Sequence, residues 1–248
     1  CIEAMMQDCK ALQVATSHML GQNFAKPFNV KFTDRAGNEQ YVWQTSWGMS
    51  TRIIGALIMT HSDDKGLIIP PKIAPTPIVI VPIWGKDCEK DDVISKAKKI
   101  ATKIILEMDC VVHVDERDER PGPKFYDWER KGIPLRIEIG PRDITNNTVV
   151  MVRRDLGDKA VVPLTNLTPK IKELLNNIQS NLHERAIQYR EKMTQKINSY
   201  DTMKNILTNK EGGFIIACWC GDPKCEAKVK KDTTATIRCI PFEQENKK

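Results

Sequence analysis

A strand–helix–strand pattern over residues 78–114 places the strongest constraint on the fold. Ile78–Ile83 is a continuous, mostly β-branched run, which predicts a strand buried on both faces. Residues 91–108 carry apolar side chains at three- and four-residue spacing, which predicts an amphipathic helix, and residues 111–114 predict the next strand. A strand, a crossover helix and a second strand of this kind form a parallel unit. The centre of the chain therefore belongs to the α/β class.

More elements extend this unit into a domain. A short helix is predicted over residues 124–131, followed by strands at 135–139, 148–153 and 159–162. Two prolines within Pro75-Thr76-Pro77 indicate a linker before it. The sequence thus predicts a five-stranded mixed α/β domain over residues 76–165.

The flanking segments predict two further domains. Residues 1–75 contain strand-like runs, a hairpin between Phe28 and Trp43, and an apolar run at 53–59 long enough for a buried helix. After residue 166, Thr168 is predicted as a helix N-cap with proline next to it, and an apolar stripe follows over several turns. We expect an antiparallel sheet with helices at 1–75 and a helix leading into a small α/β domain at 166–248.

Composition limits the class of protein. The 248 residues are 41% apolar and contain no run long enough for a membrane span, and the eight cysteines are irregularly spaced, which favours a reducing cytoplasm. The chain begins at Cys1 and is expected to be part of a longer protein. Of the net charge of +6, the excess lies in residues 166–248, with 15 basic and 10 acidic side chains. This balance is compatible with a nucleic-acid partner and equally with a solvated surface.

Two polar groups in the first 75 residues have candidate chemistry. Arg52 stands at the start of the apolar helix, where a phosphate would be a natural partner for its planar fork, although a capped core helix is as good an interpretation. Gln13, Thr16 and His18 offer amide, hydroxyl and imidazole groups to a sugar or a base, or they are satisfied polar groups at a strand end.

The residues around Arg52 also resemble a known family. Ser46-Trp47-Gly48, Ser50-Thr51-Arg52, Met59-Thr60-His61 and the run from Pro70 to Pro75 are similar to motif 3 of class II aminoacyl-tRNA synthetases, in the form found in archaeal and eukaryotic-type prolyl-tRNA synthetases. The resemblance continues along essentially the whole chain. It implies that residues 1–75 are the end of a class II catalytic domain with an antiparallel sheet.

The resemblance implies roles for these residues. Arg52 would be a catalytic residue on the phosphates of ATP with Mg²⁺, and Gln13 and Thr16 would also contact ATP. His18, Ser46 and Trp47 would line the pocket for L-proline. Two positions depart from the family pattern, since Cys9 and Ala15 replace glycines. Motifs 1 and 2 do not occur in these residues, so the chain alone is expected to be inactive.

In residues 76–165 the similarity is to the anticodon-binding domain of the same family. Lys124-Phe125, Trp128-Glu129 and Lys131 to Pro134 carry it, with Arg136 and Gly140 to Asp143. It implies that Glu129, Arg136 and Lys159 recognise the two guanines of the proline anticodon. Cations suit guanine's acceptors and a carboxylate suits its N–H groups. From the residues alone, solvated charges are the more common interpretation. The string Asp115 to Arg120 is likewise interpreted as a solvated loop.

A cysteine pair in the last domain resembles half of a metal site. Cys220 and Cys225 enclose a turn, which suits two of the four ligands of a structural Zn²⁺, and Cys218 and Cys239 are the nearby thiols. The site is therefore expected to be incomplete in this chain.

Taken together, the resemblance implies a proline-tRNA ligase, which activates L-proline with ATP and transfers it to proline tRNA. A cytoplasmic homodimer without a membrane contact is expected. The alternative is a non-catalytic RNA-binding or regulatory paralogue built from the same domains.

Overall fold

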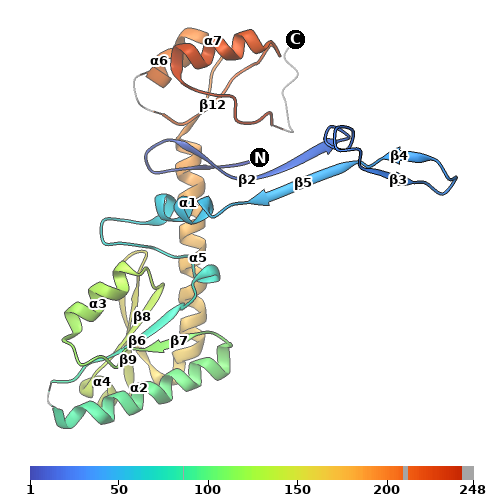
Figure 1. Cartoon of the computed structure of the whole chain (residues 1–248). Helices are drawn as coiled ribbons and strands as arrows, with labels where there is room; N and C mark the ends of the chain where they lie inside the picture. The colour runs from blue at the N-terminus through green and yellow to red at the C-terminus, as the bar shows by residue number, and fades with distance from the viewer. Residues whose placement is uncertain (86, 209–211, 242–248) are drawn as a thin grey trace. The chain divides into compact units, whose positions relative to one another are not determined.

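The computed structural model describes residues 1–85, 87–208 and 212–241. Contacts divide the chain into two compact units, one from His61 to Gln188 and one that combines residues 1–60 with the segment from residue 189 onward (Figure 1). The predicted boundaries after residues 75 and 165 stay predictions, because these units group residues 61–75 and 166–188 with the central part. None of the helices in the described parts is both long and apolar enough to span a membrane.

A five-stranded mixed sheet forms the centre of the continuous unit, as predicted. Its order is β10-β9-β8-β6-β7, where β6 runs parallel to β7 and β8 and the other neighbours are antiparallel. The strands are β6 (Ile78–Pro82), β7 (Val112–Val114), β8 (Leu135–Ile139), β9 (Thr148–Arg153) and β10 (Lys159–Pro163). The predicted parallel strand–helix–strand pattern is confirmed.

Helices cover the two faces of this sheet differently. One face, with Ile80 and Ile137 at its centre, packs against apolar residues of α2 and α5 in the main core. On the other face Val79 and Val81 pack against Ile133 and α3. The helical elements of this unit are η1 (Pro71–Ile73), α2 (Asp87–Met108), α3 (Pro121–Arg130), α4 (Pro141–Asn146), η2 (Leu164–Asn166) and α5 (Leu167–Lys192), which continues into the other unit.

The start of α5 differs from the prediction. The helix begins at Leu167 directly after η2, so Thr168 is inside its first turn and is not the N-cap. Its hydroxyl donates to Glu107 Oε2 instead, and the residue is buried. The 3₁₀ turn had no signal in the sequence. The predicted apolar stripe is confirmed, because Ile171, Ile178 and Leu182 are buried.

The other unit contains a three-stranded antiparallel sheet and a separate hairpin. The sheet has the order β1-β2-β5, and β3 pairs with β4 where the hairpin was predicted. The bounds are β1 (Ile2–Met5), β2 (Ala11–Gly21), β3 (Lys31–Thr33), β4 (Glu39–Tyr41), β5 (Gln44–Met49) and α1 (Arg52–His61), whose last residue belongs to the continuous unit. After α5 come β11 (Thr194–Lys196), α6 (Tyr200–Thr208), β12 (Phe214–Ile216), parallel to β11, and α7 (Pro223–Thr233).

Helix α1 is less buried than predicted. Only Ala56 is buried, and Ile54 is 59% exposed. In the turn after β1, Gln7 donates hydrogen bonds to the carbonyls of Met59 and Thr60 at the C-terminal end of α1. Apolar composition therefore predicted the helix correctly and its burial wrongly.

Gly66 lies beyond the end of α1 in an unusual backbone conformation. The helix ends at His61, and Gly66 forms a turn with Asp63, at φ 134°. A Cβ at Gly66 would lie 2.5 Å from the Cα of Arg130. The absence of a side chain thus allows two backbones to touch.

Replacing Gly66 with alanine should therefore lower the free energy of unfolding by about 2 kcal/mol or more, from backbone strain and the clash with Arg130. Urea unfolding measures the change. Gly157→Ala is the matched control in the same unit, since Gly157 has φ 78° but no atom near its Cβ position. It should cost about 1 kcal/mol, the conformational strain alone. Equal losses in the two variants would contradict the close approach.

Candidate nucleic-acid interface

One row of residues crosses the five-stranded sheet and brings two predicted recognition residues together. Pairing places Arg136 of β8 opposite Val152 of β9, and Val152 opposite Lys159 of β10. Residues that lie opposite each other point to the same face of a sheet. Arg136 and Lys159 therefore share one face, although 23 positions separate them in the sequence.

Arg136 holds two carboxylates on this face. Its Nη1 donates to Glu129 Oε1 at 3.2 Å, and its Nε donates to Glu138 Oε1 at 3.1 Å. The Arg136 side chain is only 7% exposed, whereas Glu129 is 32% exposed. A guanidinium has five N–H groups, so donors remain for a ligand after these contacts.

Phe125 of α3 supports the same group of side chains. The Arg136 Cζ lies 4.2 Å from the centre of the Phe125 ring, which is a cation–π contact. Lys159 Nζ lies 5.9 Å from that ring and 3.7 Å from Glu138 Oε1. We call Phe125, Glu129, Arg136, Glu138 and Lys159 the reader cluster.

The reader cluster stands where α3 stops covering the sheet. Phe125 and Trp128 of α3 pack over the β6 side of this face. Farther along, on β10, Val161 is 69% exposed and Lys159 is 57% exposed at its side chain. The cluster therefore has a packed, rigid side on β8 and an open side on β10, from which a base could approach.

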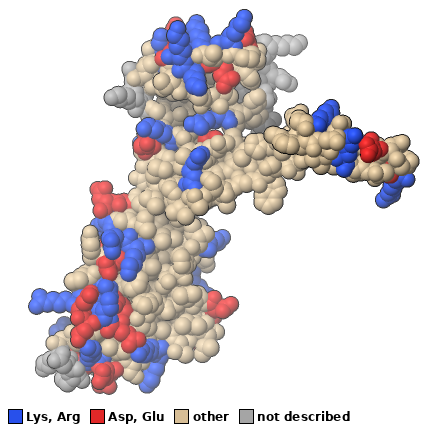
Figure 2. Space-filling view, viewed as in Figure 1, with Lys and Arg blue, Asp and Glu red and all other residues tan. Residues whose placement is uncertain are grey.

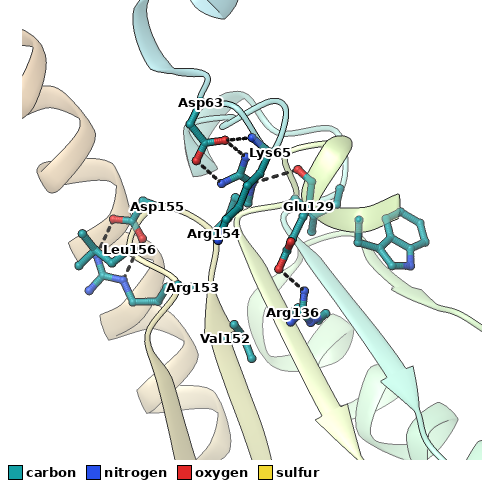
Figure 3. A pocket seen from close by; sticks show the side chains of 12 residues that line it. Asp63, Lys65, Glu129, Arg136, Val152, Arg153, Arg154, Asp155 and Leu156 are labelled. Atoms are coloured by element: carbon teal, nitrogen blue, oxygen red, sulfur yellow. Dashed lines mark hydrogen bonds and ion pairs between the residues drawn. The ribbon is translucent and has the colours of Figure 1, made fainter. Parts of the chain in front are cut away.

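A pocket adjoins the cluster (Figure 3). Glu129 and Arg136 line it together with residues from the β9–β10 connection and the segment after α1, among them Lys65, Arg154 and Leu156. Acidic and basic side chains are intermixed here, as they are over the visible surface of this unit in Figure 2. A surface of mixed charge attracts phosphate less strongly than a uniformly basic one does.

The loop from Asp115 to Arg120, which was predicted to be solvated, is bound to α3 next to this site. Asp115 is 1% exposed, and its carboxylate accepts hydrogen bonds from Arg117 and from the indole of Trp128. Burial alone would raise the pKa of Asp115, but these hydrogen bonds outweigh it and lower the pKa to about 2. Lys124 is fully buried beneath it and donates to the Asp115 carbonyl oxygen at 3.1 Å. The alternation of charge in the sequence did not reveal the contacts with Trp128 and Lys124, because these two residues lie on α3.

Five of the six residues predicted to bind ATP or proline, all but Arg52, lie on the three-stranded sheet of the other unit. Thr16 Oγ1 and His18 Nε2 are 3.3 Å apart, and Ser46 is paired opposite His18. Trp47 is paired opposite the intervening residue and is 82% exposed. A bulge in β2 between Gln13 and Ala15 shifts the alternation of side chains, so Gln13 shares the face of Thr16, His18 and Ser46, while Trp47 lies on the other face. The structure thus groups four of the five on one face, and their roles stay predictions.

Arg52 is the first residue of α1 and is exposed. Its backbone amide donates to Ser50 Oγ at 3.4 Å. The described residues provide no ion-pair partner for its guanidinium, so its fork is available to an anion. Its predicted contact with ATP phosphates remains a prediction.

Cys220 and Cys225 adjoin each other at the start of α7. Hydrogen bonding from the backbone of Asp222 lowers the pKa of Cys220, and the contact with Cys220 raises that of Cys225. Within residues 1–85, 87–208 and 212–241, no group of three or more candidate metal ligands forms. Two thiols fit half of a tetrahedral zinc site and do not complete it.

Sequence reasoning missed Glu138. A signal was present, because Arg136 and Glu138 alternate with Leu135, Ile137 and Ile139 in a strand that is otherwise apolar. Two opposite charges on one face of a buried strand must pair with each other or with a neighbour. Arg154 and Asp63, which form an ion pair at the edge of the same pocket, had no comparable signal in the sequence.

Comparison with known proteins gives two domain matches. Residues 77–174 match the family model for an anticodon-binding domain. Residues 200–248 match the model for the C-terminal domain of prolyl-tRNA synthetase. The reader cluster lies within the first match.

Whole-chain similarity points the same way. The chain is 49% identical over 98% of its length to a protein named proline–tRNA ligase from Amoebophilus asiaticus, of which it covers 49%. Proteins of the same name from Oceanobacillus iheyensis and Chloroflexus aurantiacus are 49% and 50% identical, again over 98% of this chain and 50% and 51% of their own lengths. The chain thus spans about half the length of the curated relatives it matches.

Proposed function

We propose that this chain, which belongs to the prolyl-tRNA synthetase family, serves a proline–tRNA ligase as the part that reads the anticodon of proline tRNA. The observation that carries the proposal is the convergence of Glu129, Arg136 and Lys159, from three separate elements, around Phe125. All three lie within the stretch that matches the anticodon-binding model, which supports the proposal.

The chemistry of the reader cluster suits guanine. The remaining N–H groups of Arg136 can donate to the O6 and N7 acceptors of guanine. The partly exposed Glu129 carboxylate can accept from guanine N1–H and N2–H₂, which adenine does not offer in the same pattern. Lys159, on the open side, can reach a base edge or a phosphate.

For the catalytic reaction we propose that Arg52, Gln13 and Thr16 contact ATP and that His18, Ser46 and Trp47 contact L-proline. Magnesium-bound ATP would supply the adenylyl group of prolyl-adenylate, and pyrophosphate would be the leaving group. This chain's contribution would be to hold the phosphates with Arg52 and to orient proline with polar groups of β2 and β5. We further propose that the ligase works as a homodimer in the cytoplasm, and that Cys220 and Cys225 supply part of a zinc site.

The test is a titration of the 248-residue chain with proline tRNA transcripts. One transcript has the native anticodon, and two others each carry adenine in place of one of the two guanines. Each replacement should weaken binding by about 1–3 kcal/mol while the dependence of affinity on salt stays the same.

A pair of lysine variants serves as control. Lys159→Gln should weaken binding of the native transcript. Lys103→Gln should not, because Lys103 is on α2, which covers the opposite face of the sheet. Equal binding of all three transcripts would mean attraction by phosphate only and would refute anticodon reading.

A further inference from the structure

The segment Asp63–Ile69 docks on the end of the helix that carries Glu129. Leu67 N donates to the carbonyl of Arg130 at 3.0 Å, and Ile69 N donates to the carbonyl of Gly132 at 3.2 Å. This segment directly follows α1 and lies outside the stretch that matches the anticodon-binding model, which begins at residue 77. A part of the chain outside that domain match therefore contacts the site directly.

Arg154 links this segment to Glu129 itself. Its two terminal nitrogens donate to the two carboxylate oxygens of Asp63 at 2.9 and 2.6 Å, and its Nε donates to the main-chain carbonyl of Glu129 at 2.9 Å (Figure 3). The Arg154 side chain is only 5% exposed. The Glu129 carbonyl also accepts from the backbone N of Gly132 at 3.0 Å, and Arg154 adds a charged second donor at this helix C-terminus, where a cation is favourable.

We propose that Asp63 and Arg154 are positioning residues for guanine recognition by Glu129. Asp63 holds the guanidinium of Arg154 in its plane, and Arg154 holds the Glu129 backbone, so the ion pair sets where the Glu129 carboxylate meets a base. The inference rests on the proposed anticodon reading.

The geometry leaves little tolerance for loss of this ion pair. Glu129 Oε1 already accepts from Arg136 at 3.2 Å, near the long limit of a good hydrogen bond. Without Asp63, Arg154 would be a nearly buried cation with no carboxylate in its fork, and it would have to move toward solvent or another acceptor. Either movement withdraws its bond from Glu129.

The experiment compares four variants of the 248-residue chain in the transcript titration: Asp63→Asn, Arg154→Lys, Glu129→Gln and the control Asp64→Asn. Glu129→Gln first identifies which of the two guanines Glu129 reads. Asp63→Asn should lose about fivefold or more of the discrimination at that same guanine, the lower end of what one base contact contributes. Discrimination at the other guanine and the salt dependence should change little. Arg154→Lys should behave like Asp63→Asn, because a lysine has no Nε donor in the right place.

The outcomes separate the two proposals. Asp64 is exposed and should be replaceable without effect. Full discrimination in both Asp63→Asn and Arg154→Lys would overturn the positioning role, and so would an equal loss at both guanines, which indicates general damage to the fold. If the unaltered chain does not distinguish the transcripts, anticodon reading itself fails. Thermal unfolding of each variant shows that it is folded before titration.

Discussion

Replacing Arg136 with methionine is expected to lower the free energy of unfolding by about 3 kcal/mol, the low end for breaking a buried ion pair from one side. The Arg136 side chain is 7% exposed and its partner Glu138 is 10% exposed. After the replacement, Glu138 would lose its buried partner and keep Lys159 at 3.7 Å, a solvated cation that does not replace the guanidinium. Urea unfolding at pH 7 measures the loss.

Two further variants test the cause. Adding Glu138→Gln to Arg136→Met should restore about 1 kcal/mol or more, because it removes the uncompensated carboxylate. Lys159→Met should change stability by less than about 0.5 kcal/mol, since its ion pair is long and solvated. If the double variant were no more stable than Arg136→Met, packing of Arg136 on Phe125, rather than charge, would account for the loss.

Local pattern was sufficient to predict the five-stranded sheet. The bounds of β8 and β9 agree with the prediction, and α2 differs by four residues at its start. The apolar residues of these strands and of α2 recur with a clear period. The parallel arrangement of β6 and β7 follows from the helix between them. Where period and burial agree, the sequence carries enough information to predict an element.

The predictions that failed concern interactions over long sequence distances. Asp115 was expected to be solvated because its neighbours are charged, yet Trp128, 13 positions later, donates to it at 2.7 Å. Arg154 and Asp63 are 91 positions apart and form a bidentate ion pair. No periodic pattern encodes such pairs, which depend on how the elements are packed. The exposure of α1 was missed for the same reason, since composition does not say what covers a helix.

The candidate site lies between the elements that the sequence predicted and the long-range contacts that it did not. Glu129, Arg136 and Lys159 had no distinguishing pattern of their own and were selected through the family resemblance. The structure adds a physical reason for their convergence, since the register of β8, β9 and β10 aligns two of them and α3 delivers the third. Cys9 also connects the resemblance with the structure. It replaces a glycine of the family pattern and has φ 63°, a backbone conformation that glycine adopts most easily.

Replacing Asp115 with asparagine is expected to lower the free energy of unfolding at pH 7 by about 2 kcal/mol. The Asp115 carboxylate accepts from Nε and Nη2 of Arg117 at 2.9 and 2.8 Å and from Trp128 Nε1 at 2.7 Å. An amide would direct N–H groups toward some of these donors and would remove the buried carboxylate that Arg117 contacts through two of its nitrogens.

The effect should depend on pH in a definite direction. In the folded protein the pKa of Asp115 is about 2, below its ordinary value of 3.8. A depressed carboxyl pKa stabilises the fold above the unfolded pKa, and this contribution disappears as pH falls through the folded pKa. The shift corresponds to about 2 kcal/mol. The difference in stability between the unaltered chain and Asp115→Asn should therefore shrink between pH 4 and pH 2.

Urea unfolding followed by tryptophan fluorescence over pH 7 to pH 2 makes the comparison, with Glu119→Gln as the matched control. Glu119 lies 3.4 Å from Arg117 but is 46% exposed, so its removal should cost less than about 0.5 kcal/mol. A difference between the unaltered chain and Asp115→Asn that stays constant across this pH range would assign the loss to altered packing. A difference that shrinks would show that the ionised carboxylate anchors the 115–120 loop to α3, the helix that carries Glu129.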